Sequence, residues 1–371
     1  MRSALSYDLG SRLKDILLRA VPSLTSDRWQ APRVVTFMMT YRCNLRCTMC
    51  WQWGEQGLFH DYSREHELQQ LDLSTLRGII DDLAADGTGV FLWGGEPFLH
   101  REILPFVEHV KSQGMYCSIN TNGTYLPRDS RRLVELGVDA IMVSVDGPRE
   151  IHDKIRGMNG SFQKIADGIR AVREARNGDG RKPEIIVNTT ISPGNQEALL
   201  ETYRVVEALG ADQMILSQLW FTTEQIGKAN EAYFREKFSA HAPSWRGFVM
   251  DVSGLNTRRI AEQMQEMSLL KSPMKLRFLP DLAPEQVHEY YRSPSESFGK
   301  TRCLVPWLEA EILPSGEVTP CSDRPDLVMG NVKQESFRQI WNNGKYQAFR
   351  KAMREDGLFP YCSRCCGLWS H

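Results

Sequence analysis

Apolar positions along the chain change between two periods from residue 33 onward. Short β-type runs alternate with longer stretches in which apolar residues return every three or four positions, a pattern that indicates strands followed by helices. Such alternation predicts an α/β fold with parallel strands, and six units suggest a partial (β/α)6 barrel similar to a TIM barrel. The expected strands are 33–40, 88–93, 115–120, 138–145, 184–191 and 211–218, and the expected helices are 73–86, 101–113, 128–136, 161–176 and 195–209.

Three segments lie outside this core, which we bound at residues 33–220. Residues 1–32 are expected to form a short helical extension, because their apolar residues recur near helical spacing. Residues 221–300 are expected to connect the core to a second domain, and residues 301–371, which are rich in cysteine, are expected to form that domain. Within the connecting segment the pattern predicts two helices and one strand, at 256–270, 284–293 and 274–280.

Polar residues recur on one face of the predicted strands. Buried parallel strands are normally continuous apolar runs, yet Ser118, Asn120, Ser144, Asn188 and Thr190 occupy alternating positions, and alternate residues of a strand share a face. Turn chemistry accounts for polar residues just after strands, but it accounts less well for those within them. We therefore expect a polar-lined interior that accepts a charged small molecule near the C-terminal strand ends.

The composition is that of an ordinary globular protein. The 371 residues are 42% hydrophobic and 25% charged, with a net charge of −1, so charge gives no reason to expect nucleic acid or an anionic membrane as a partner. The N-terminus has no apolar signal region, and no apolar run approaches the roughly 20 residues that span a bilayer. A cytoplasmic location is expected, where thiols stay reduced.

The nine cysteines fall into tight groups. An odd total and local clustering favour metal ligation over disulfide pairing. Three lie within eight residues near the first strand, five lie in the last 70 residues, and one stands alone: Cys43, Cys47 and Cys50, then Cys303, Cys321, Cys362, Cys365 and Cys366, with Cys117 between the groups as an expected core residue.

The first group supplies three thiolates, whereas a closed zinc site needs four ligands. Three thiolates suit an iron–sulfur cubane that leaves one iron open to a substrate or cofactor. A zinc site remains an alternative at this point, and with it a zinc-stabilised binding protein that is not an enzyme.

Four sequence motifs resemble those of radical S-adenosylmethionine (radical SAM) enzymes. RCNLRCTMCW, residues 42–51, directly follows the first strand and is similar to the family's C-x3-C-x2-C-aromatic signature. WGGEP (93–97), NTNG (120–123) and SVDGPREIHDKIRG (144–157) follow the next three strands. The resemblance covers about residues 33–220.

The resemblance implies a role for each motif. Cys43, Cys47 and Cys50 would hold a [4Fe–4S] cluster whose open iron chelates the amino and carboxylate groups of S-adenosyl-L-methionine (SAM). An electron from the cluster would cleave SAM to a 5′-deoxyadenosyl radical, which abstracts hydrogen from a substrate carbon, and flavodoxin or ferredoxin is the expected electron donor. Trp51 would lie beside the adenine. The expected SAM-binding residues are Trp51, Gly94, Gly95, Glu96, Ser144, Arg156 and Asn188; the glycines would let backbone approach the ligand, and a surface ion pair is the alternative for Arg156.

The second cysteine group resembles a SPASM or Twitch auxiliary-cluster domain. CLVPWLEAEILPSGEVTPC (303–321), MGNV (329–332) and PYCSRCCG (360–367) carry this resemblance. It implies one auxiliary [4Fe–4S] cluster that relays electrons, because a full SPASM domain has further cysteines beyond these. A zinc ribbon is the alternative. The expected ligands are Cys303, Cys321, Cys362 and Cys365, with Cys366 as a competitor for the last place.

Two kinds of substrate are compatible with these motifs. The Cys303-x17-Cys321 spacing is similar to that of Twitch-type dehydrogenases, which favours oxidation, dehydrogenation or epimerisation of a small, carbohydrate-like metabolite. The alternative is a maturase that crosslinks, epimerises or oxidises a peptide, although the 32 residues before the first strand are too few for a separate leader-recognition domain. The sequence does not select among further candidate substrate contacts, namely Trp220, Glu224, Asp251, His288 and Trp307.

Overall fold

One sheet contains all ten strands of the described residues, which in the computed structural model are 31–176, 182–322 and 324–370. The strand order is β10-β9-β8-β1-β2-β3-β4-β5-β6-β7. Strands β8 and β1 to β7 are parallel, and β9 and β10 continue antiparallel beyond β8. The strands are β1 (Val34–Met38), β2 (Gly89–Trp93), β3 (Cys117–Thr121), β4 (Ala140–Ser144), β5 (Glu184–Thr190), β6 (Gln213–Ser217), β7 (Lys275–Leu279), β8 (Glu309–Ile312), β9 (Glu317–Thr319) and β10 (Gly330–Asn331).

The six expected strands are confirmed, and the sheet is longer than expected at both ends. The strand predicted at 274–280 is β7, and it pairs with β6. Strand β8, which the sequence patterns did not single out, pairs directly with β1. Its Ala310 and Ile312 enter the core, and Glu309 and Glu311 alternate with them. A run of four residues is too short for this alternation to predict a strand, particularly within a cysteine motif. The domain boundaries themselves stay predictions.

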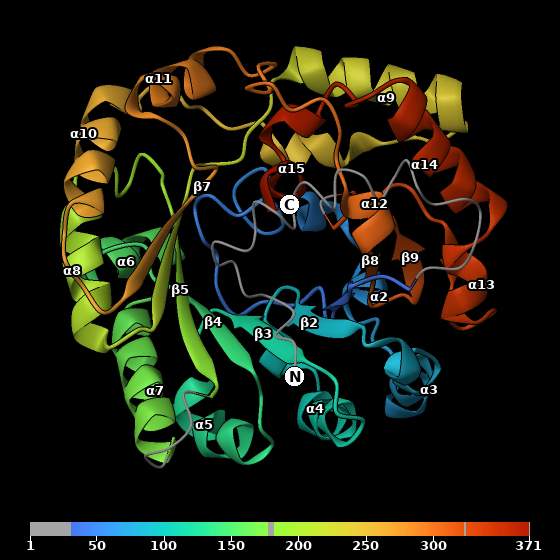
Figure 1. Cartoon of the computed structure of the whole chain (residues 1–371), viewed down its shortest axis with the longest axis horizontal. Coiled ribbons are helices and arrows are strands. Elements are labelled where there is room, and N and C mark those ends of the chain that lie inside the picture. Colours follow the sequence, from blue (N-terminus) through green and yellow to red (C-terminus); the bar gives the residue numbers. More distant parts are fainter. Residues whose placement is uncertain (1–30, 177–181, 323, 371) are drawn as a thin grey trace.

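Helices cover the outer face of the sheet, as Figure 1 shows for α4, α5, α7 and α8. The expected helices are confirmed within a few residues of their predicted ends. The helices are α2 (Arg64–Glu67), α3 (Leu73–Leu83), α4 (Ile103–Ser112), α5 (Leu126–Glu135), α6 (Arg149–Arg156), α7 (Ser161–Ala175), α8 (Leu199–Leu209), α9 (Glu224–Phe238), α10 (Thr257–Ser268), α11 (Pro284–Arg292), α12 (Val305–Leu308), α13 (Phe337–Trp341), α14 (Gly344–Glu355) and α15 (Cys366–Ser370), with 3-10 turns at Leu58–Asp61, Ala84–Asp86, Pro97–Leu99, Pro243–Phe248 and Cys362–Arg364. The expected extension at 1–32 lies almost wholly outside the described residues.

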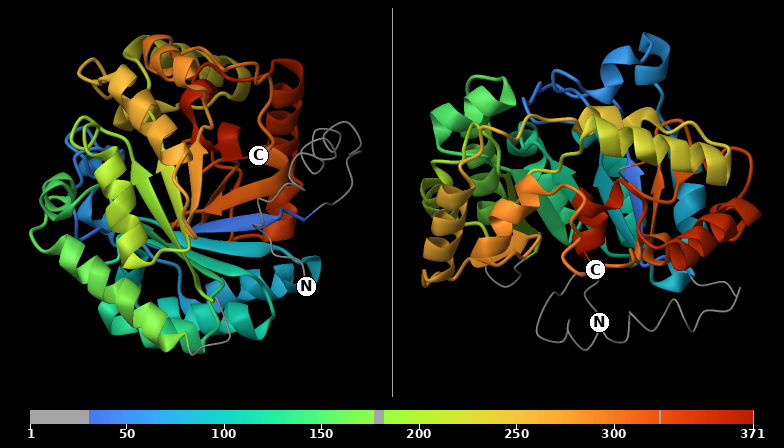
Figure 2. Two further views of the ribbon diagram at one scale, coloured as in Figure 1. Left: turned by 60° about the vertical axis from the view of Figure 1, so that its left-hand side comes forward. Right: turned by 90° about the horizontal axis from the view of Figure 1, so that it is seen from above.

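The sheet curves but does not close, so the barrel is partial. Within the described part of the chain, β7 and β10 are the two edges and pair with no further strand. The outward side chains of the strands, such as Phe37 and Ile119, are buried beneath the helices. The short C-terminal helix α15 lies on the inner side of the curved sheet (Figure 1). Figure 2 shows the strands of the sheet spreading like a fan, with helices on the outer side.

The inner face changes character along the strands. Ala140, Ile186 and Ile215 form a small apolar cluster on the inner face. Two residues further along β5 and β6, on the same face, the Ser217 hydroxyl donates to Asn188 Oδ1 at 2.9 Å. The inner face is therefore apolar at the start of the strands and polar toward their C-terminal ends.

No described helix is long and apolar enough to cross a bilayer.

Candidate functional site

The first cysteine group lies in the loop that follows β1. Each of its sulfurs faces an N–H donor: Leu45 N–H lies 3.4 Å from Cys43 Sγ, Trp53 N–H 3.4 Å from Cys50 Sγ, and Arg156 Nη1 3.6 Å from Cys47 Sγ. Donors of this kind favour the thiolate over the thiol. The loop is thus arranged to hold three anionic sulfurs.

Two of these thiols, those of Cys43 and Cys47, resist ionisation while no metal neutralises them. Burial raises the pKa of Cys43 to about 12. Burial also raises the pKa of Cys47, although the Arg156 guanidinium opposes the rise. A metal must therefore displace protons from these thiols when it binds, because thiolates are the ligating form.

The three thiols fit an iron–sulfur cluster. Among the described residues no three His, Cys, Asp or Glu side chains converge on a point that a single metal ion could occupy. A cluster suits a wider arrangement, because its separate irons each take their own thiolate. On the inner face of β3, Asn120 Oδ1 is buried without a hydrogen-bond partner. That oxygen is an acceptor available to a bound ligand.

Gly94 and Gly95 pack against the backbone of the cysteine loop. The sequence analysis had explained these glycines differently, by a close approach of the backbone to SAM. A Cβ atom at Gly94 would lie 2.7 Å from Thr40 O, and one at Gly95 would lie 2.2 Å from Arg42 O. Gly94 also has a φ of +142°, which side chains rarely adopt. The glycines are needed because the two backbones pack together, with Gly95 N–H donating to Thr40 O at 2.9 Å. Their contact with SAM stays a prediction.

Glu96 is fully buried and links the second and third strand ends. Its oxygens accept from Thr121 Oγ1 at 2.8 Å and from Asn122 N–H at 2.9 Å. Burial raises the pKa of Glu96 to about 7, although these hydrogen bonds oppose the rise. Asn122 in turn points its amide toward Cys43 Sγ at 3.8 Å. Glu96 therefore supports the cysteine loop through Asn122. Its contact with SAM stays a prediction.

Arg156 forms a buried ion pair rather than a surface pair. Its Nη2 lies 2.5 Å from Asp146 Oδ2, and the Asp146 side chain has no exposed surface. Asp146 Oδ1 also accepts from Thr190 N–H at 3.1 Å. The sequence analysis did not propose Asp146 as a functional residue, because Asp-Gly directly after a strand is typical of a turn. The only sequence signal was its place in the motif that also contains Arg156.

Ser144 and Asn188, two other predicted SAM contacts, lie side by side. They are register partners on β4 and β5. Asn188 is already bonded to Ser217. The structure therefore brings together Cys43, Cys47, Cys50, Glu96, Arg156, Ser144 and Asn188 around the C-terminal ends of β1 to β6. Which of them contact SAM stays a prediction.

A wall of aromatic rings runs between the two cysteine groups; we call Trp51, Trp93, Phe248 and Tyr361 the aromatic wall. The Trp51 ring stacks on Phe248 with centroids 5.0 Å apart and an interplanar angle of 17°, and Phe248 meets Tyr361 at 5.6 Å. Trp93 lies 6.3 Å from Trp51. Tyr361 directly precedes Cys362. One face of Trp51, the predicted adenine neighbour, is thus occupied by Phe248.

Four cysteines of the second group surround one buried region. Electrostatic coupling shows that Cys303, Cys321 and Cys362 are neighbours, and burial raises the pKa of both Cys303 and Cys362. Arg324 interacts electrostatically with Cys321, Cys362 and Cys365, so these three cysteines lie near its guanidinium. Cys365 is 8% exposed, whereas Cys366 is half-buried and begins α15. This arrangement favours Cys365 as the fourth ligand, which stays a prediction. Cys117 is buried in the core.

The structure separates the remaining candidate contacts. Trp220 packs against the aromatic wall. Glu224 pairs with Lys228 on an exposed helix surface, Asp251 is exposed, and His288 is bonded to Thr257 near the surface. Trp307 packs against the main core. Only Trp220 of these five lies beside the aromatic wall.

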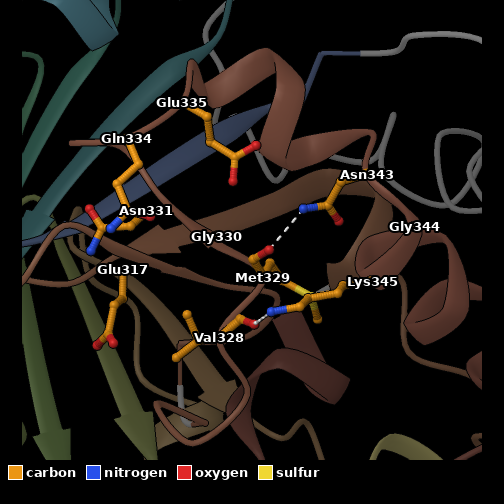
Figure 3. Close-up of a pocket in the computed structure, with 10 residues that line it drawn as sticks. All are labelled: Glu317, Val328, Met329, Gly330, Asn331, Gln334, Glu335, Asn343, Gly344 and Lys345. Carbon is orange, nitrogen blue, oxygen red and sulfur yellow. Dashed lines mark hydrogen bonds between the residues drawn. The ribbon is translucent and has the colours of Figure 1, made fainter.

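A cavity of about 700 Å³ lies away from all of these residues, at the β9–β10 edge of the sheet (Figure 3). Two side chains fix its rim to the backbone: Asn343 donates to Met329 O at 2.8 Å and Lys345 to Val328 O at 3.3 Å. None of the predicted site residues lines it. It is not the site that the cysteines define.

Two family models match the chain in the regions described above. Residues 37–206 match the model of the radical SAM superfamily. Residues 303–366 match the model of the SPASM iron–sulfur cluster-binding domain. The second match begins at Cys303 and ends at Cys366, so it contains all five C-terminal cysteines.

Similar proteins cover most of the chain. An AdoMet-dependent heme synthase of Methanosarcina barkeri is 27% identical over 355 residues, which is 90% of this chain and 88% of that protein. The pre-heme d1 synthase of Dinoroseobacter shibae is 23% identical over 90% of this chain and 78% of its own length. The subtilosin biosynthesis protein AlbA of Bacillus subtilis is 23% identical over 86% of this chain and 61% of its own length.

A solved structure shares the fold. Streptococcus suis SuiB, solved with its precursor peptide SuiA, aligns with a TM-score of 0.62 at 12% identity, covering 100% of this chain and 78% of SuiB. At this identity the likeness concerns the fold alone.

Proposed function

Because this chain belongs to the radical SAM superfamily and carries a C-terminal SPASM-type domain, we propose that it oxidises a peripheral carbon of a tetrapyrrole. One observation carries the choice of substrate: the heme synthase similarity extends over about nine-tenths of both chains. The carbohydrate-like substrate expected from the cysteine spacing finds no support among the relatives named above.

The cofactors supply the difficult chemistry and the chain holds them. When bound, SAM and the first cluster supply a 5′-deoxyadenosyl radical that takes hydrogen from the substrate. Cys43, Cys47 and Cys50 would ligate that cluster. Arg156 orients Cys47, and Asn122 orients Cys43. These contacts fix two of the three sulfurs in a loop that is partly buried.

The aromatic wall suits a planar macrocycle. Flat rings bind aromatic side chains by offset stacking or edge contacts. Trp51, Trp93 and Tyr361 supply aromatic rings between the two cysteine groups, and Trp93 is the half-buried one of the three. The polar ends of the strands, including the unpartnered Asn120 Oδ1, offer hydrogen bonds to charged groups at the rim of the macrocycle.

Two-electron oxidation removes one hydrogen atom and then one electron from a substrate carbon, and the resulting cation loses either a proton from a neighbouring atom or carbon dioxide from a neighbouring carboxylate. The second electron needs an acceptor near the substrate. Cys303, Cys321, Cys362 and Cys365 would hold that acceptor, one auxiliary [4Fe–4S] cluster, beside the far end of the aromatic wall. Two clusters predict about eight irons per chain. We further propose flavodoxin or ferredoxin as electron donor and a cytoplasmic location.

The test uses the full chain with both clusters, SAM, dithionite and Fe-coproporphyrin III, under anaerobic conditions. We expect the porphyrin to increase 5′-deoxyadenosine formation and to change mass. Cys47→Ala should abolish SAM cleavage, whereas Cys321→Ala should retain cleavage and lose product. An unchanged porphyrin, with the same 5′-deoxyadenosine yield as without it, would exclude this substrate class.

Peptide modification is the second candidate, and the similarity to AlbA favours it. The aromatic wall would then bind an aromatic side chain of the peptide rather than a macrocycle. Precursor peptides encoded beside the gene are the probes for this alternative. A mass change in such a peptide, with none in the porphyrin, would establish it.

A further inference from the structure

Arg324 is a buried cation at the centre of the second cysteine group. Its side chain belongs to a residue only 4% exposed. The guanidinium Nη2 lies 3.9 Å from Cys362 Sγ, and the group stacks 4.0 Å above the Tyr361 ring. Its backbone N–H donates to Cys321 O at 3.1 Å. One residue therefore contacts the loops of two predicted ligands.

A buried guanidinium needs an anion. Burying an unpaired charge is costly, so buried charges are normally paired. Among the residues that the structure describes, no carboxylate lies within 4.0 Å of Arg324. The neighbouring Asp326 instead accepts hydrogen bonds from the backbone and hydroxyl of Ser244. The groups in contact with the guanidinium are the Cys362 sulfur and the Tyr361 ring.

Two half-buried arginines, Arg156 and Arg350, have different partners. Arg156 also contacts a cysteine, but Asp146 neutralises its charge. Arg350 stacks on Trp341 at 4.2 Å and donates to the carbonyls of Pro306 and Trp341. Burial alone would lower the pKa of Arg324, but Cys362 and Cys321 raise it.

We propose that Arg324 is the counter-ion of the auxiliary cluster and raises its reduction potential. A cubane with four thiolates is anionic and gains one more negative charge on reduction. A fixed cation beside it stabilises the reduced form more than the oxidised form. Arg324 is thus a positioning residue that adapts this cluster to accept an electron, an inference that rests on the auxiliary cluster of the proposed function.

The test measures a potential rather than turnover. In a Cys47→Ala background only the auxiliary cluster should load, with about four irons. Its midpoint is then read by EPR in a redox titration. We expect Arg324→Gln to lower the reduced-to-oxidised ratio at fixed potential at least tenfold, a downward shift of about 59 mV or more for one electron. Arg324→Lys, which keeps the charge, should stay closer to the parent.

Arg350→Gln is the matched control, because it removes a half-buried, stacked arginine for which no contact with a cysteine sulfur is seen among the described residues. An unchanged midpoint in Arg324→Gln would overturn the proposal, as would an equal shift in Arg350→Gln. If Arg324→Gln loses the cluster, retention in Arg324→Lys supports the role of charge, and loss in both contradicts it. Absence of iron in the Cys47→Ala parent would refute the auxiliary cluster itself, whereas four irons without an effect of Arg324 would refute only this inference.

Discussion

The guanidinium of Arg156 lies 3.6 Å from the sulfur of Cys47, although the two residues are 109 positions apart. Asp146 holds the other side of the guanidinium at 2.5 Å. The end of β4 and the helix that follows it therefore act on the loop after β1. The first cysteine group is supported by a charge network as well as by its own backbone.

Removing Asp146 should be costly. Asp146→Asn leaves the buried Arg156 without its carboxylate, and breaking a buried pair typically costs about 3–5 kcal/mol. The exposed pair Asp167–Arg170, at 3.2 Å, provides the control, and Asp167→Asn should cost about 1 kcal/mol or less. Urea unfolding of the iron-free, reduced protein measures both. Equal losses would show that the buried network contributes little.

The two adjacent cysteines near the C-terminus should behave differently. Cys365→Ala should lower the iron content by about four per chain, because Cys365 belongs to the buried group around Arg324. Cys366→Ala should leave iron content unchanged, since that residue begins α15 and is half-buried. Iron analysis of anaerobically purified proteins decides the matter, and the reverse result would identify Cys366 as the ligand.

Gly95 should tolerate no side chain. The added Cβ in Gly95→Ala would lie 2.2 Å from Arg42 O, which is backbone and must move together with Cys43. We expect loss of the first cluster and of SAM cleavage. Gly78→Ala is the control, because no atom lies within 4 Å of its added Cβ on α3, and alanine should stabilise a helix interior by roughly 0.5–1 kcal/mol. Full iron content in Gly95→Ala would contradict the packing argument.

Glu96 should make stability depend on pH. Its pKa is raised to about 7 from 4.5, so the folded chain binds this proton more tightly than the unfolded chain. The resulting stabilisation is complete below about pH 4.5 and is lost as the pH rises to about 7, in total about 3 kcal/mol. Glu96→Gln cannot titrate and should lack this component between pH 5 and 8. Identical pH profiles of the unfolding free energy would show that Glu96 stays ionised throughout.

Local patterns were sufficient for most of the fold. The six predicted strands and their helices are present because apolar periodicity depends on residues close in sequence. The pattern also identified the strand at 274–280 but not its place beside β6. Strand β8 was not predicted, because it has only four residues and two of them are glutamates. A central parallel strand is normally a continuous apolar run.

The candidate site divides in the same way. The spacing of Cys43, Cys47 and Cys50 indicated three thiolates in one loop, since a short loop keeps its residues together. It could not show that Gly94 and Gly95 pack on that loop, or that Glu96 turns toward Asn122. Those contacts depend on which strand ends become neighbours.

The sequence by itself indicated the candidate donor atoms, the alternation of six strands with their helices, and the membership of two cysteine groups. Only the tertiary structure decided where the charged groups lie: Arg156 beside Asp146, and Arg324 beside Cys362. The physical reason is that charge pairing and hydrogen bonding inside a protein are satisfied by neighbours in space. Those neighbours come from distant segments, so they are settled only when β1 lies between β8 and β2 and the two cysteine groups meet across the aromatic wall.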